Sequence, residues 1–221
     1  MAHGLPCTCK VSCLVFCCAA MKGVTVTGYK GGCGKSMTAI HLATFFSERG
    51  KTLLVDSDPN RTAVSWSRRG SLPFRVIVEK QAVMVVKSQD WDWVVFDTPA
   101  RPQSDDLREL AEGTSLLVLP TLPDIVSAEP MIQTTKDLTG FLYRALVTLV
   151  PPAPNTDGAD MKEALTGFGV PTFSTTIRRA VGFTKAAEKG VPVRDLKGRD
   201  SLGWLDYQSL GKEILEVLNH G

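Results

Sequence analysis

Short, nearly continuous apolar runs recur along this chain and alternate with longer segments of helical spacing. Such runs are typical of strands that are buried on both faces, as in a parallel sheet. The expected strands cover residues 23–28, 52–56, 74–79, 93–97, 115–120, 145–150 and 171–177. The expected helices cover residues 36–49, 104–112, 125–138, 160–167, 180–189 and 207–219. The alternation predicts an α/β fold: a doubly wound, mostly parallel sheet with helices on both faces, which binds ligands at the carboxyl ends of its strands.

The chain length of 221 residues suits one domain of this kind and is short for two. We expect that domain to occupy residues 21–221, after a leader of residues 1–20. The leader holds five of the six cysteines, Cys7, Cys9, Cys13, Cys17 and Cys18. Because their spacing lacks the paired C-x-x-C of a zinc site, we expect an unstructured extension or an upstream start codon. A metal-binding tail and an export or lipid-anchor segment are the alternatives.

Glycines and lysines crowd the stretch GYKGGCGKS, residues 28–36, between the first expected strand and the first expected helix. Consecutive glycines let the backbone turn tightly and bring several N–H groups toward one point, where the helix adds its positive end. That point suits a phosphate. Lys35 can reach the β- and γ-phosphates of a nucleotide, and the Ser36 hydroxyl can ligate Mg²⁺. The sequence therefore predicts a phosphate-binding loop; a glycine-rich turn with incidental lysines is the alternative.

Carboxylates end two further expected strands. Asp56 and Asp58 follow the second strand, and Asp97 ends the fourth. A capped turn could explain the first pair alone, since aspartate and proline are common in turns. Asp97, however, stands where a carboxylate can contact Mg²⁺ through water. Because the carboxyl ends of parallel strands meet at one edge, the three elements together predict an enzyme that hydrolyses ATP with Mg²⁺.

The run KGGCGKS fits the signature K-G-G-x-G-K-[ST], and here the sequence resembles the deviant Walker A family of ATPases, which includes ParA, MinD and the nitrogenase iron protein. The resemblance covers residues 21–218. It implies that Lys30 crosses a dimer interface to the phosphates of ATP held by the other subunit. The expected assembly is a homodimer with two ATP molecules between its subunits, so that hydrolysis depends on pairing.

The same resemblance assigns roles to the carboxylates. The motif D-S-D-P (residues 56–59) matches switch I of ParA, in which Asp58 orients or activates the attacking water and Asp56 supports the metal and the loop. The motif D-T-P resembles switch II (residues 97–100) and makes Asp97 the Walker B aspartate. The expected catalytic residues are thus Lys30, Lys35 and Asp58, and the expected metal contacts are Ser36, Asp56 and Asp97. Nucleotide contacts are expected from Lys30, Gly31, Gly32, Cys33, Gly34, Lys35, Ser36 and Met37.

Two positions depart from the family pattern. Met37 interrupts the hydroxyl residues that usually follow the lysine, so that its backbone N–H remains for the α-phosphate but one side-chain contact is lost. Ala100 replaces the second proline of switch II. Cys33 occupies a variable position of the loop, where we expect a small neutral filler; a redox-sensitive thiol is the alternative.

Missing features separate the branches of the family. No cysteine follows Cys33, which argues against a cluster-bearing reductase or scaffold. The last expected helix contains one lysine and two glutamates, so we expect it to pack against the sheet through Leu210, Ile214 and Leu218 rather than to lie on a membrane. No cluster of tyrosines of the kind that marks the family's tyrosine kinases ends the chain.

The net charge of +2 is too small to imply a nucleic-acid partner, but residues 171–200 carry seven basic side chains against three acidic ones. This segment resembles the ParA region that binds DNA without base readout. The resemblance assigns DNA contacts to Arg178, Arg179, Lys185 and Lys189. A solvated helix face is the alternative.

The resemblance as a whole implies a short ParA protein without an N-terminal helix-turn-helix, cytoplasmic and associated with the nucleoid. Its expected task is plasmid or chromosome partition: the ATP-bound dimer binds DNA and releases it on hydrolysis stimulated by a ParB-like partner. The first alternative is the same ATPase positioning a protein cargo, such as a carboxysome or a chemoreceptor array. The second is a non-enzymatic, ATP-dependent binding switch in which Asp58 is catalytically idle.

Overall fold

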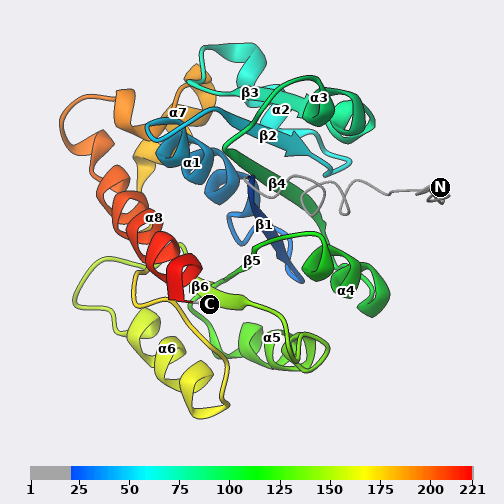
Figure 1. The fold of residues 1–221 in the computed structure, drawn as a ribbon. Coiled ribbons are helices and arrows are strands. Elements are labelled where there is room, and N and C mark those ends of the chain that lie inside the picture. Colours follow the sequence, from blue (N-terminus) through cyan, green and yellow to red (C-terminus); the bar gives the residue numbers. More distant parts are fainter. Residues whose placement is uncertain (1–20, 221) are drawn as a thin grey trace, which may run out of the picture.

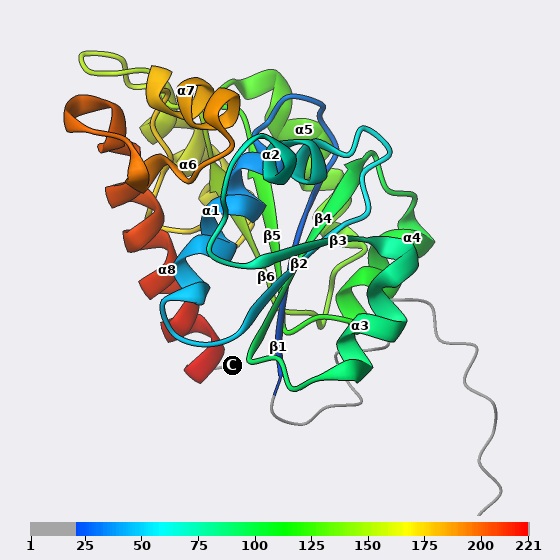
Figure 2. The same cartoon turned by 90° about the horizontal axis from the view of Figure 1, so that it is seen from above.

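A computed structural model describes residues 21–220, so the predictions made for residues 1–20 lie outside the described part of the chain. The fold is the predicted one. Six parallel strands form one sheet in the order β3-β2-β4-β1-β5-β6, with helices on both faces (Figures 1 and 2). The strands are β1 (Lys22–Gly28), β2 (Thr52–Asp56), β3 (Arg75–Val78), β4 (Trp93–Ala100), β5 (Leu116–Thr121) and β6 (Tyr143–Val147).

The helices divide between the two faces of the sheet. They are α1 (Lys35–Ser47), α2 (Thr62–Arg69), α3 (Ala82–Ser88), α4 (Ser104–Glu112), α5 (Ile125–Lys136), α6 (Asp157–Gly167), α7 (Val181–Lys189) and α8 (Gly203–His220), with short 3₁₀ turns η2 (Glu79–Gln81), η3 (Val193–Asp195) and η4 (Gly198–Ser201). Helices α1, α7 and α8 lie on one side of the sheet, and α3, α4 and α5 lie on the other (Figure 2). In β4, Val95 packs in the cluster under α1, whereas Val94 and Phe96 pack under α3. Burial on both faces is why the strands read as continuous apolar runs.

The predicted strand at residues 171–177 is wrong. That segment makes only isolated bridges to the edge of the sheet, Ala145 with Thr172 and Val150 with Arg178. Between them the backbone N–H groups of Ser174 and Thr175 donate to the Glu213 carboxylate of α8, at 2.7 and 3.0 Å. Because a side chain takes these donors, a regular ladder with β6 cannot form.

Other boundaries also differ from the prediction. Strand β6 ends at Val147 instead of residue 150, because Leu149 has a left-handed φ of 55° that interrupts the extended backbone. Helices α2 and α3 were not predicted; at eight and seven residues they are too short for a clear helical periodicity.

Helix α8 belongs to the core, although it packs mainly on α1. Leu210 and Ile214 are fully buried, as predicted, and Leu218 is half-buried. Gly211 lets the two helices approach: a Cβ placed there would come within 2.3 Å of the Phe45 ring. Among residues 21–220, no helix combines the length and the apolar character needed to cross a bilayer.

Candidate functional site

The loop between β1 and α1 has the backbone geometry of a phosphate cradle. Gly32 and Gly34 have left-handed φ angles of 76° and 81°, which a residue without a Cβ adopts at little cost. Gly34 caps α1, and no side chain caps the helix, so the amides of its first turn face the loop. Lys35 is only 7% exposed and curls back over the loop, with its ammonium donating to the Lys30 carbonyl at 3.2 Å. The helix end, the amides and the buried lysine together favour an anion.

Thr148, just after β6, anchors this loop and was not predicted as a site residue. Its hydroxyl lies 2.8 Å from the Cys33 carbonyl and 3.0 Å from the Thr121 carbonyl at the end of β5. Thr148 is fully buried. The sequence does mark Thr148, because it is the single polar residue in the apolar run ALVTLV. Such a residue is unusual in a strand buried on both faces.

Cys33 is a buried part of the loop. Its thiol donates to the Lys30 carbonyl at 3.1 Å, and burial raises the pKa of the thiol while Lys35 opposes the rise. A buried thiol with a raised pKa is a poor nucleophile. The geometry therefore supports the filler interpretation over the redox-sensitive one.

The predicted carboxylates meet at the carboxyl ends of two neighbouring strands. The register of β2 with β4 places Asp56 directly beside Asp97. Asp97 is fully buried, and neither of its oxygens has a hydrogen-bond partner of ordinary geometry among the described residues. Burial raises the pKa of Asp97 to about 7; Ser36 and Lys35 lower it, whereas Asp56 and Asp58 raise it. Keeping a buried carboxylate charged without an ordinary hydrogen-bond partner is costly, and a bound cation would offset that cost.

These residues fit Mg²⁺. The Ser36 hydroxyl and the Asp97 carboxylate supply hard oxygen donors at the mouth of the phosphate loop, and Mg²⁺ keeps most of its other ligands as water and phosphate oxygens. No group of three or more acidic, histidine or cysteine side chains gathers into a metal cage among residues 21–220. A site completed by a nucleotide agrees with that finding.

Asp56 and Asp58 play different structural parts. Asp56 accepts the backbone N–H of Asp58 at 3.1 Å and that of Val64 at 3.0 Å, so it ties switch I to the first turns of α2. Burial raises the pKa of Asp56. Asp58 accepts the Asn60 N–H at 2.8 Å, which fixes the orientation of its carboxylate. These hydrogen bonds support the loop-supporting role proposed for Asp56, and both that role and its metal contact stay predictions.

A cleft of about 540 Å³ brings together six of the predicted loop residues and Asp58, whereas Lys30, Cys33, Asp56 and Asp97 do not line it. It is lined by Gly31, Gly32, Gly34, Lys35, Ser36, Met37, Asp58, Pro59, Asn60, Thr62, Trp66, Pro99 and Ala100. The phosphate loop, switch I and switch II thus share one cavity. Lys30 lines a different cleft with Tyr29 and Arg101, and its ammonium lies 3.5 Å from the Asp124 carboxylate.

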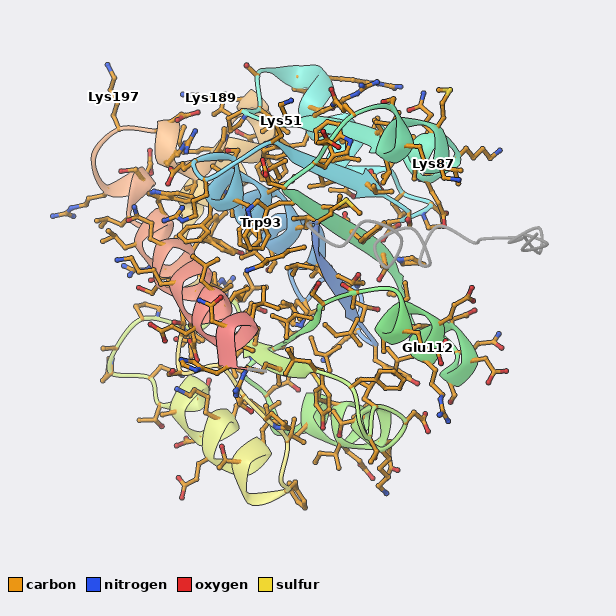
Figure 3. The ribbon with its side chains drawn as sticks, viewed as in Figure 1. Lys51, Lys87, Trp93, Glu112, Lys189 and Lys197 are labelled. Carbon is orange, nitrogen blue, oxygen red and sulfur yellow. The ribbon has the colours of Figure 1, made fainter. Side chains whose placement is uncertain are left out.

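The four residues predicted to contact DNA lie together at the start of α7 and along it, but their charges are not equally available. Arg178 makes a bidentate ion pair with Asp206 of α8, at 2.6 and 2.7 Å, and Lys185 lies 2.7 Å from Asp200. Arg179 and Lys189 are exposed, and Figure 3 shows Lys189 on the same side of the molecule as Lys197. The bidentate pair holds Arg178 in place, so that this residue links the segment before α7 to α8.

Comparison with known proteins agrees with this geometry. The profile of the CobQ/CobB/MinD/ParA nucleotide binding domain matches residues 24–193. The maintenance of carboxysome distribution protein A from Gloeobacter kilaueensis is 29% identical over 200 residues, which are 86% of this chain and 93% of that protein.

Solved structures share the fold. A putative plasmid partition protein from Borrelia burgdorferi, bound to AMPPNP, has a TM-score of 0.68 at 19% identity, over 90% of this chain and 99% of that one. The septum site-determining protein MinD from Pyrococcus horikoshii, complexed with Mg-ADP, has a TM-score of 0.66 at 16% identity, over 88% of this chain and 96% of that one. Because the family profile spans most of the sequence and its phosphate loop, this chain belongs to the CobQ/CobB/MinD/ParA nucleotide-binding family.

Proposed function

We propose that this protein is a Mg²⁺-dependent ATPase that uses ATP to position a cargo on DNA. The observation that supports the proposal is the convergence of the phosphate loop, switch I and switch II on one cleft, which Lys35 and Asp58 line and behind which Asp97 is buried next to Asp56. The family is one of nucleotide-binding domains, and the solved partition protein and MinD hold AMPPNP and Mg-ADP in their structures. ATP with Mg²⁺ is the ligand that this donor set suits.

Each residue of the cleft has a task in phosphoryl transfer to water. The loop amides and the Lys35 ammonium bind the β- and γ-phosphates and balance the charge that builds up on the transferred group. Ser36 and Asp97 would hold Mg²⁺, which neutralises phosphate charge when it is bound. Asp58, with its orientation fixed by the Asn60 N–H, accepts a hydrogen bond from the attacking water and aligns it.

Lys30 supports a homodimer as the active form. It lies outside the nucleotide cleft of its own chain, and its side chain is half exposed. In a facing pair of subunits Lys30 would supply a second cation to the partner's phosphates, so that hydrolysis requires pairing. This role is the one that the deviant Walker A signature implies.

The basic segment around α7 supports binding to DNA, and hence a protein associated with the nucleoid. We assign the direct phosphate contacts to Arg179 and Lys189, with Lys185 contributing when it exchanges Asp200 for a phosphate. Arg178 contributes by holding the segment on α8. Contacts of this kind read no sequence and weaken steeply as salt rises.

Two cargoes remain candidates. A plasmid or chromosome attached through a ParB-like protein is the first, supported by the fold shared with the Borrelia partition protein. A protein compartment attached through an adaptor is the second. It is favoured by the near full-length sequence similarity to a carboxysome distribution protein, which is stronger support than a shared fold alone.

Hydrolysis and pairing are tested with three single variants of the full chain, Lys35→Ala, Asp58→Ala and Lys30→Ala. Asp58→Ala should lose about 100-fold in turnover while it still pairs on adding ATP, as measured by light scattering. Lys35→Ala should lose ATP binding, and Lys30→Ala should bind ATP without pairing. Unchanged turnover in Asp58→Ala would leave the non-enzymatic switch as the better description.

DNA binding is tested by the salt dependence of ATP-dependent co-sedimentation with random-sequence DNA. Arg179→Ala/Lys189→Ala should weaken binding at every sequence and reduce the salt slope by about two, one for each lost phosphate contact. Lys87→Ala is a matched control, because Lys87 is exposed on α3 at the other side of the molecule (Figure 3). Equal binding by the double variant and the control would remove this surface from the proposal.

A further inference from the structure

A third cleft, of about 470 Å³, lies between β6, an edge strand of the sheet, and the end of α8. Leu142 and Arg144 line it on the strand side, and Glu213, Glu216 and Val217 line it on the helix side. Figure 1 shows the end of α8 beside β6. Figure 2 shows that this end of α8 lies where β1 begins, away from the loop between β1 and α1. The cleft is therefore separate from the nucleotide cleft.

Arg144 stands at a position of β6 that faces the core. Side chains alternate along a strand, and the residues two positions away on either side, Leu142 and Leu146, both pack in the apolar cluster under α1 and α8. Ala145 and Val147 pack in the cluster on the opposite face. The alternation thus places a charged side chain in a row of leucines, beneath the end of α8.

The Arg144 guanidinium has no counter-ion in the described part of the chain. Its Nε is buried without a hydrogen-bond partner, and neither Glu213 nor Glu216 forms an ion pair with it. The Glu213 carboxylate is bound elsewhere: it accepts the Ser174 N–H and hydroxyl, both at 2.7 Å, and the Thr175 N–H at 3.0 Å. A partly buried guanidinium without a counter-charge is costly, and a carboxylate bound in the cleft would offset that cost.

The charges of the lining favour a zwitterion over a simple anion or cation. An anion in the cleft would be attracted by one guanidinium but repelled by two carboxylates, those of Glu213 and Glu216. A cation would be attracted by the carboxylates but repelled by Arg144. A molecule that carries both a carboxylate and an ammonium avoids both repulsions, because each of its charges has an opposite charge to face.

The same lining offers a place to each part of such a molecule. Arginine pairs with carboxylates through two parallel N–H groups, which suits Arg144 to the carboxylate. The exposed Glu216 carboxylate stands on the opposite wall, where it can accept a hydrogen bond from the ammonium. Leu142 and Val217 supply apolar surface for a hydrocarbon side chain.

We propose that the cleft between β6 and the end of α8 binds a free α-amino acid with an apolar side chain, its carboxylate on Arg144 and its ammonium toward Glu216. This site goes beyond the proposed ATPase function and does not require it. The two clefts share no lining residue, and amino-acid binding can be measured without ATP.

The first experiment titrates the full chain with L-leucine at pH 8 by ligand-detected NMR, so that imidazoles contribute little positive charge. The expected Kd is on the order of 1 mM, as suits so small a ligand. Isoamylamine, which is leucine without its carboxylate, should bind at least about tenfold more weakly. Isocaproate, which is leucine without its ammonium, should bind about fivefold more weakly. Equal affinity for leucine and either analogue, or no binding of leucine, would overturn the proposal.

Arg144→Gln tests the carboxylate contact and should weaken leucine binding at least about tenfold. The matched control, Arg75→Gln, removes an exposed arginine from β3 at the opposite edge of the sheet and should change binding by no more than about twofold. Because Arg144→Gln removes an unpaired charge, the variant should stay folded, which circular dichroism checks. Equal binding by the two variants would overturn the proposal.

Glu216→Gln tests the ammonium contact at an exposed side chain whose replacement leaves the core intact. It should weaken leucine binding about threefold and should not weaken isocaproate binding, because isocaproate has no ammonium to lose a partner. This comparison decides the proposal even if Arg144→Gln fails to fold. Equal effects of Glu216→Gln on the two ligands would overturn the proposed orientation and, with it, the assignment of a zwitterion.

Discussion

The ammonium of Lys30 lies 3.5 Å from the carboxylate of Asp124, which immediately precedes α5, and both side chains are about half exposed. Lys30 is therefore held near a counter-ion of its own chain, at a cleft separate from the one that Lys35 lines. If Lys30 moves to a partner's phosphates in the active pair, this contact must be exchanged for them. Asp124 then competes with pairing.

Asp124→Asn should consequently strengthen ATP-dependent pairing by up to about fivefold, the range expected when an exposed ion pair is removed. Light scattering at several protein concentrations with ATP measures the change. Asp105→Asn, which removes an exposed carboxylate from α4, is the control. Weaker pairing in Asp124→Asn, approaching that of Lys30→Ala, would instead show that Asp124 holds Lys30 in its productive position.

Asp97→Asn should increase the stability of the nucleotide-free protein and weaken its binding of Mg²⁺. The buried carboxylate lacks a hydrogen-bond partner among the described residues, so replacing its charge by an amide should raise the stability of the nucleotide-free protein by about 1–2 kcal/mol at pH 8. The same change should remove the extra stability that Mg²⁺ adds to the ATP-bound protein. Urea unfolding without nucleotide, and thermal unfolding with ATP in the presence and absence of Mg²⁺, measure the two effects. A destabilised variant that keeps the Mg²⁺ effect would contradict the assigned role.

The parts of this fold that could be predicted are those specified by neighbouring residues. Buried strands read as apolar runs, and the glycines, Lys35 and Ser36 form their loop within nine consecutive residues. Asp56 and Asp97 could be expected at one edge of the sheet because each ends a predicted parallel strand, although β4 continues past Asp97 to Ala100. The basic segment shows the limit of that reasoning: Arg178 reads as a free cation until Asp206, 28 residues later, is found against it. Similarly, Glu213 diverts the backbone of Ser174 from a distance of 39 residues.

His41 predicts a pH dependence of stability. Its Nδ1 lies 2.7 Å from the Met37 carbonyl, its Nε2 accepts the Val193 N–H, and its ring stacks on Tyr207, so the buried imidazole is neutral. Burial lowers the pKa of His41 from 6.5 to about 4. The unfolded chain therefore binds a proton between these values that the folded chain excludes, and stability should fall by roughly 3 kcal/mol as pH drops from 6.5 to 4.

Urea unfolding of the unchanged chain and of His41→Gln between pH 4 and 7 isolates this contribution, because other groups titrate in both proteins. The slope of stability against pH should be smaller in His41→Gln over this range. Identical slopes would show that His41 titrates alike in the folded and unfolded states.

Replacing Arg178 and replacing its neighbour Arg179 should have different effects on stability and on DNA binding. Arg178→Ala breaks two hydrogen bonds to Asp206 and should cost about 1 kcal/mol of stability, a modest value because the arginine is partly exposed. Arg179→Ala should leave stability within about 0.5 kcal/mol and weaken DNA binding directly. Chemical unfolding and co-sedimentation of each single variant make the comparison. If Arg178→Ala were as stable as Arg179→Ala and weakened DNA binding more, Arg178 would be a direct phosphate contact rather than a structural link to α8.

Thr148→Val tests whether β6 holds the phosphate loop in shape. Valine keeps the volume of threonine but cannot donate to the Cys33 carbonyl, which is then left buried without that donor. The expected cost is about 1–3 kcal/mol, shared between global stability and the ordered form of the loop. Because the loop amides must be aligned to bind phosphate, ATP affinity should fall about tenfold, whereas Thr148→Ser, which retains the hydroxyl, should bind ATP nearly as well as the unchanged chain. Calorimetric titration with Mg-ATP measures both. Equal affinities in the valine and serine variants would mean that the loop keeps its shape without this anchor.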